Sequence, residues 1–139
     1  DFIKGNVLGL FDRNFDKIYT DFLVFSEDKN KYIDFDSYHW TLDDEKKPLF
    51  DIDQEINLVD IRKQTVTRIG FRSSTCWVEN TFWENDSTII LLENNTENRP
   101  RITKIELKNS ISETFKYKDS MRFKPKYYDL RFKKKGLEN

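Results

Sequence analysis

Apolar and polar residues alternate with a period of two along most of this chain. Near the end, for example, Tyr128, Leu130 and Phe132 share one parity, and charged residues stand between them. This period is typical of half-buried strands, because successive side chains of a strand point to opposite faces. We therefore expect strands over Lys17–Phe25, Tyr32–Leu42, Glu55–Ile61, Thr65–Arg72, Thr75–Val78, Ser87–Leu92, Arg101–Leu107, Ile111–Tyr117 and Tyr127–Phe132.

The segment Tyr32–Leu42 changes its parity in the middle. Ile33 and Phe35 lie on one parity, and after Ser37 the apolar positions, Trp40 among them, move to the other. A β-bulge shifts side chains from one face of a strand to the other. We expect a bulge or bend near Ser37 that turns both sets toward one core.

Two further patterns concern the order of strands. The run Ile89–Leu92 is apolar on both parities, which predicts a central strand covered on both faces. The polar triplets Arg62–Gln64 and Lys108–Ser110 each separate two alternating segments, so each predicts a hairpin.

The chain also contains an internal repeat with an offset of 46 residues. Residues 56–63 (INLVDIRK) align with 102–109 (ITKIELKN), with matching apolar, acidic and basic positions. An aromatic or apolar strand precedes each copy, at 37–42 and at 87–92. This order of a strand, a loop and a hairpin resembles a blade of a β-propeller. The tryptophan-bearing segment 77–83, before the second copy, is also similar to the strands of such blades.

The composition adds a second resemblance. The chain is rich in Lys, Asn, Phe and Asp, contains no Ala and has one Cys, and in this it is similar to uncharacterised exported, lipoprotein-type domains of Bacteroidetes. That resemblance implies blade-like antiparallel sheets and a periplasmic or cell-envelope location rather than a cytoplasmic one. The sequence starts at Asp1 without an initiator Met, from which we expect that an upstream segment was removed.

Length restricts the architecture. With 139 residues and 16.8 kDa the chain has the size of one domain. Closed propellers typically have four to eight blades, whereas this chain supplies about three repeats of this offset, so we do not expect a closed propeller. We predict a single all-β domain over 1–139, either an antiparallel sandwich or a partly closed up-and-down meander with a propeller-blade-like repeat.

Charge is distributed unevenly, although the net charge is only -1. Residues 1–60 carry seven Lys/Arg against fifteen Asp/Glu, and residues 99–139 carry thirteen against five. We expect acidic and basic strands to lie side by side in one domain. No apolar run approaches the roughly 20 residues of a membrane-spanning helix.

Several kinds of chemistry are excluded or weak. One His and one Cys cannot build a zinc site of the His/Cys type, and we expect a structural or solvent-facing His39 and a small core residue in Cys76. The Asp-x-Asp pairs are weak candidates for binding Ca²⁺. We expect instead that they lie on a solvated strand face. We expect no cofactor, no metal and no catalytic residue. The two pairs are Asp34 with Asp36 and Asp51 with Asp53.

The basic C-terminal segment interleaves cations with rings. This pattern occurs in single-stranded nucleic-acid grooves, but it also fits an edge strand with rings inward and lysines outward. We favour the edge strand, and because the pI is near 5.9 we do not expect nucleic acid as a partner. The cations are Lys124, Lys126, Arg131, Lys133, Lys134 and Lys135, and the rings are Phe123, Tyr127, Tyr128 and Phe132.

The densest aromatic cluster supplies the candidate binding residues. Trp and Arg are enriched at the energetic centres of protein interfaces, and Arg72, Trp77, Phe82 and Trp83 lie within a dozen positions. We therefore predict a non-enzymatic binding or interaction domain with a protein partner, a class that includes inhibitor and immunity-type proteins.

Two alternatives to this function stay open. A lipocalin-like carrier of a small apolar ligand would need a cavity lined by some of Phe22, Phe35, Trp40 and Tyr128. A carboxylate-based hydrolase ranks lower, and would need at least two carboxylates in one cleft, one with a pKa raised by burial.

Overall fold

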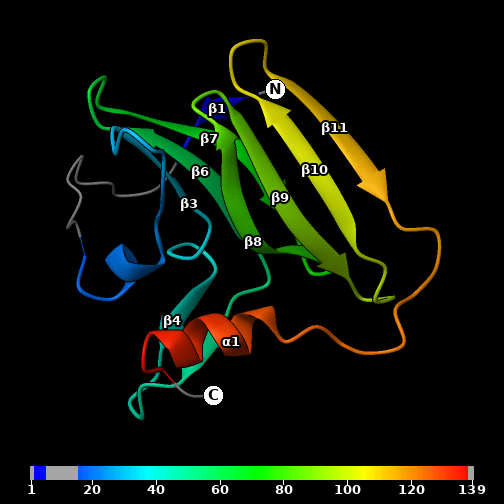
Figure 1. The fold of residues 1–139 in the computed structure, drawn as a ribbon. Coiled ribbons are helices and arrows are strands. Elements are labelled where there is room, and N and C mark those ends of the chain that lie inside the picture. The colour runs from blue at the N-terminus through cyan, green and yellow to red at the C-terminus, as the bar shows by residue number, and fades with distance from the viewer. Residues whose placement is uncertain (1, 6–15, 138–139) are drawn as a thin grey trace.

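The computed structural model describes residues 2–5 and 16–137, and in these the fold is all-β and antiparallel, as predicted (Figure 1). The first sheet has the order β1 (Ile3–Lys4), β7 (Thr65–Arg72), β6 (Gln54–Asp60), β3 (Lys31–Asp34) and β2 (Val24–Phe25). The second has the order β11 (Ile111–Lys116), β10 (Arg101–Glu106), β9 (Thr88–Asn95) and β8 (Cys76–Asn85). A hairpin of β4 (Trp40–Leu42) and β5 (Pro48–Phe50) lies at one end, beside the helix α1 (Tyr127–Lys134).

The main core lies between the two sheets. Alternation places one parity of each strand inward, so both sheets contribute buried aliphatic side chains to a single cluster. Ile89 and Leu91 of β9 are fully buried there, and β9 lies between β8 and β10, which confirms the predicted central position. The expected cover on both faces is incomplete, because on the outer face Ile90 is buried but Leu92 is only half-buried. The buried residues of the main core are Ile33, Phe35, Ile56, Ile69, Val78, Ile89, Leu91 and Ile105.

Both predicted hairpins form, and they are built alike. In each, the copy of the repeat is an inner strand, β6 or β10, which pairs with the next strand, β7 or β11. Gln64 and Ser110 are separated by the offset of the repeat, and both have a positive φ, of 52° and 51°. The repeat therefore extends to the backbone conformation of the turn.

The predicted strand over Tyr32–Leu42 is instead two strands separated by a tight turn. The carboxylate of Asp34 accepts hydrogen bonds from the backbone N–H groups of Asp36 (3.1 Å) and Ser37 (3.0 Å), and these bonds stabilise the turn. The expectation of one shared core is thus wrong, because the turn carries Trp40 into a second cluster.

The two end segments were also mispredicted. The strand expected over Lys17–Phe25 is a 3₁₀ helix, η1 (Tyr19–Phe22), followed by the two-residue β2. The strand expected over Tyr127–Phe132 is the helix α1. Tyr128 and Phe132 share one face of a strand, because both positions are even, and also one face of a helix, because they are four residues apart. Leu130 would lie on the same face of a strand but not of a helix, and it is 57% exposed.

A second, aromatic cluster fixes α1 to the sandwich. The Trp40 ring packs edge-on against those of Phe22 and Phe132, with centroids 5.1 and 4.9 Å apart. The guanidinium of Arg131 forms an ion pair with the buried Asp36 and lies 4.3 Å from the ring centroid of Phe35. Tyr19, Leu42, Tyr128 and Leu137 complete this second cluster.

Candidate functional site

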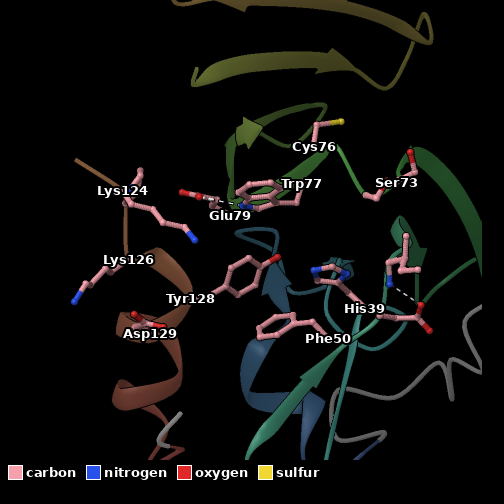
Figure 2. A pocket seen from close by; sticks show the side chains of 14 residues that line it. His39, Phe50, Ser73, Cys76, Trp77, Glu79, Lys124, Lys126, Tyr128 and Asp129 are labelled. Carbon is pink, nitrogen blue, oxygen red and sulfur yellow. Dashed lines mark hydrogen bonds between the residues drawn. The ribbon is translucent and has the colours of Figure 1, made fainter. Parts of the chain in front are cut away.

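An aromatic pocket of about 510 Å³ lies where α1 and the β4–β5 hairpin meet the sandwich (Figure 2). Its aromatic walls are His39, Phe50 of β5, Trp77 of β8 and Tyr128 of α1. We call these residues and the space between them the aromatic pocket. Its polar rim is formed by Asp51, Ser73, Ser74, Glu79, Lys124, Lys126 and Asp129.

A buried glutamine holds the walls of the aromatic pocket in place. The side-chain amide of Gln54 donates to the Phe35 carbonyl (3.1 Å) and to the Tyr128 hydroxyl (2.9 Å), and its oxygen accepts from the Val78 N–H (2.7 Å). The Tyr128 hydroxyl in turn donates to the Val78 carbonyl. The rings of Phe50 and Tyr128 meet edge to face at 5.2 Å. The walls are therefore preorganised before any ligand enters.

Three titratable groups of the aromatic pocket, Glu79, His39 and Tyr128, are shifted toward their neutral forms by burial. Burial raises the pKa of Glu79, although hydrogen bonds from Trp77 and Asn94 and the charge of Lys124 oppose the shift. Burial lowers the pKa of His39, against a hydrogen bond to the Asp53 carbonyl. Because that carbonyl can only accept, the contact of 3.1 Å places the proton on Nδ1 and leaves Nε2 as an acceptor.

An outer groove of about 550 Å³ lies on the other side of the segment that leads into α1. Three side chains in register, Leu92, Ile102 and Phe115, cross β9, β10 and β11 on the outer face of the second sheet. We call these three the outer stripe. Leu92 and Ile102 continue into the outer groove, whose further apolar lining is Pro100, Met121, Phe123, Pro125, Tyr127 and Leu130.

The four predicted binding residues do not form one surface. Trp77 lines the aromatic pocket, and Phe82 is 46% exposed on the outer face of β8. Trp83 packs against the main core and donates its indole N–H to the Val24 carbonyl (2.9 Å). Neighbours in sequence on one strand point to opposite faces, so proximity in sequence did not mean proximity on a surface.

Arg72 belongs to a charge network between the sheets. Its guanidinium and that of Arg101 (3.0 Å) bind the fully buried Glu93, which also accepts from the Thr103 hydroxyl. Burial alone would raise the pKa of Glu93, but the hydrogen bond and charge of Arg72, with the partners on β10, hold it below its ordinary value. Cys76 accepts a hydrogen bond from Arg101 at 3.1 Å and is half-buried.

The aspartate pairs do not converge on a metal site. No group of three or more His, Cys, Asp or Glu side chains suited to a metal occurs within residues 2–5 and 16–137. Asp34 and Asp36 are buried, at 2% and 1% exposure, so the solvated strand face expected for them is wrong. Both stabilise the turn before β4, whereas Asp51 is exposed on the rim of the aromatic pocket.

The residues of the two alternative functions are also placed. Phe35 belongs to the main core, while Phe22 and Trp40 pack in the second cluster, so the rings named for a carrier are divided between two packed interiors. Asp51, Glu79 and Asp129 line one pocket, and the pKa of Glu79 is raised by burial.

The C-terminal cations also differ from expectation. They do not alternate along an edge strand: Lys124 and Lys126 precede α1, and Lys133 and Lys134 lie in its last turn, where the helix dipole favours positive charge.

Comparison with known proteins names no relative. No family model, no curated protein and no solved structure matches this chain. Among the described residues there is no helix long and apolar enough to cross a membrane.

Proposed function

We propose that this chain is a non-enzymatic binding domain whose outer groove receives an acidic, apolar segment of a partner protein. The observation that carries the proposal is the outer stripe together with the exposed side chains of the outer groove. Phe115, Phe123 and Leu130 are 60%, 68% and 57% exposed. Single exposed apolar residues are ordinary, but contiguous ones mark interaction surfaces.

The charge around the outer groove supports an acidic partner. The exposed Lys124 and Lys126 line the outer groove, and Arg122, Lys116 and Lys118 lie next to its apolar residues or to Phe115 along the chain. The two carboxylates of the lining are buried, and that of Glu93 is already paired with Arg72 and Arg101. Complementary charge at the rim of an interface accelerates association and favours the correct partner. β11 is also an edge strand, so the backbone of an extended segment has a free edge to pair with.

Selection from a displayed library of random twelve-residue peptides tests this proposal. We expect enrichment of peptides that combine Asp or Glu with large apolar residues, with binding that weakens as salt is added. The double variant Phe123→Ala, Leu130→Ala should weaken binding about tenfold or more. Phe71→Ala, at 42% exposure on the first sheet, is the matched control. Enrichment of basic peptides, or equal binding by the double variant, would reject the proposal.

A second candidate function, a carboxylate-based hydrolase, is supported by the three carboxylates of the aromatic pocket. A carboxyl group with a raised pKa can donate a proton to a leaving group at neutral pH. Nitrophenyl esters and glycosides provide a direct assay: Glu79→Gln should abolish turnover while the melting temperature is kept. Absence of turnover by the unmodified chain would reject this candidate.

The export suggested by composition stays a prediction.

A further inference from the structure

The aromatic pocket offers flat apolar walls of fixed orientation. Figure 2 shows Trp77 above Tyr128, with Phe50 below it and His39 to one side. Because Gln54 and the contact between Phe50 and Tyr128 hold these rings, little order has to be created when a ligand enters. A volume of about 510 Å³ lies within the roughly 300–1,000 Å³ of small-molecule sites.

The rim of the aromatic pocket combines acceptors and donors of both signs. Asp51, Glu79 and Asp129 present carboxylates, whereas Lys124 presents an ammonium group that Figure 2 shows directed toward Glu79. The hydroxyl groups of Ser73 and Ser74 add groups that both donate and accept.

These charges argue against a charged ligand. An anion would face three carboxylates, and a cation would face Lys124 and Lys126, of which Lys124 already acts on the charge of Glu79. A small molecule without polar groups would use the aromatic walls but none of the donors and acceptors of the rim, of which Glu79 is buried and the others are exposed. The site requires an uncharged ligand with one flat apolar face and hydroxyl groups along its edges.

We infer that the aromatic pocket binds a neutral carbohydrate, of one or two sugar units. The C–H face of a sugar ring covers the indole of Trp77 or the ring of Tyr128. Its hydroxyl groups each donate one hydrogen bond and accept two, so they satisfy both Glu79 and Lys124. This inference does not depend on the peptide site in the outer groove, which lies across the segment 121–127.

A glycan array that contains neutral, sialylated, sulfated and amine-bearing members tests the inference, followed by calorimetric titration of the bound members. We expect binding to neutral glycans only. Trp77→Ala should remove it, and Phe82→Ala, which removes an exposed ring on the outer face of β8, should leave it unchanged. Since Trp77 is half-buried, the exposed Lys124→Ala provides a second variant that does not disturb packing, with an expected loss of about tenfold for one hydrogen bond.

Three results would overturn the inference: no glycan bound, binding confined to sialylated, sulfated or amine-bearing glycans, or neutral binding that both Trp77→Ala and Lys124→Ala retain. Peptide binding in the outer groove is measured on the same samples. Lys124 lines both sites, whereas Trp77 lines only the aromatic pocket and Phe123 and Leu130 line only the outer groove. Loss of sugar binding alone in Trp77→Ala, and of peptide binding alone in the double variant Phe123→Ala, Leu130→Ala, separates this inference from the proposed function.

Discussion

The main core and the second cluster are built in different ways. The main core is mostly aliphatic and comes from strands, whose alternation alone decides which side chains face inward. The second cluster is aromatic and joins Phe22, Trp40 and Phe132, which come from three distant segments. The candidate sites follow this division: the second sheet carries the outer stripe, whereas Tyr128 connects the second cluster to the aromatic pocket. The less regular region therefore supports the site with aromatic walls.

The largest expected effect separates these two regions directly. Phe132→Ala removes a fully buried ring that contacts Phe22, Trp40 and Tyr128. We expect the free energy of unfolding to fall by about 3–5 kcal/mol. The backbone amides of α1 should also lose their protection from hydrogen exchange. Urea titration gives the free energy, and amide hydrogen exchange identifies the amides that open.

Leu130→Ala is the matched control for that substitution. Leu130 lies on the same helix but is exposed, so its change should stay within about 0.5 kcal/mol. If α1 were the strand that the alternation predicts, both residues would face inward and both variants would be destabilised. Equal losses would therefore contradict the helix and restore the sequence-based prediction.

The sequence predicted the sandwich better than its end because the two regions depend on different information. For β6, β7, β9, β10 and β11 the side-chain period is a local property, and it was sufficient. Tyr128 and Phe132 fit both even parity and a helical face, and only contact with the second cluster decides between them. The bend after Asp34 depends on side-chain hydrogen bonds that no periodicity reveals.

The candidate site was predicted only in part, for a related reason. Trp77 was named because it is a large aromatic residue, and it does line the aromatic pocket. Its neighbours there come from positions distant in sequence, such as Phe50 and Tyr128. The signal that the sequence offered for Glu79 was its place two residues after Trp77 on one strand face, where the indole N–H reaches it at 3.1 Å.

The next effect tests the charge network of Glu93 between the two sheets. Glu93→Gln leaves Arg72 and Arg101 without their buried carboxylate, and should lower the free energy of unfolding by about 2–3 kcal/mol at neutral pH. The native pKa of Glu93 lies below its unfolded value of 4.5, so its stabilisation is present above that value and lost as pH falls through the native pKa. Urea titrations of both proteins should converge as the pH falls below the native pKa of Glu93. A difference that does not depend on pH would contradict the assigned charge network.

A smaller effect compares the two copies of the repeat. Gln64→Gly and Ser110→Gly each place glycine at a left-handed position, and each should stabilise the chain by about 0.5–1 kcal/mol. The preceding residues, Lys63 and Asn109, have no positive φ, so glycine there should destabilise. Thermal melts of the four variants check both signs. Opposite signs for Gln64→Gly and Ser110→Gly would show that the two turns are not equivalent.

The smallest effect concerns the carboxylate of the aromatic pocket, whose pKa is shifted opposite to that of Glu93. Burial raises the native pKa of Glu79 above 4.5, so the folded chain is favoured by protonation below that value, and this advantage is lost as pH rises through the native pKa. Glu79→Gln removes a charge that burial penalises, and should raise the free energy of unfolding, measured by urea titration, slightly at pH 7, by about 0.5 kcal/mol or less, and not at pH 4. If the Glu79 carboxylate were stabilising, as that of Glu93 is, Glu79→Gln would instead lower the free energy of unfolding at pH 7. In that case Glu79 would be a structural partner of Trp77 and Lys124 rather than a group held ready for a ligand.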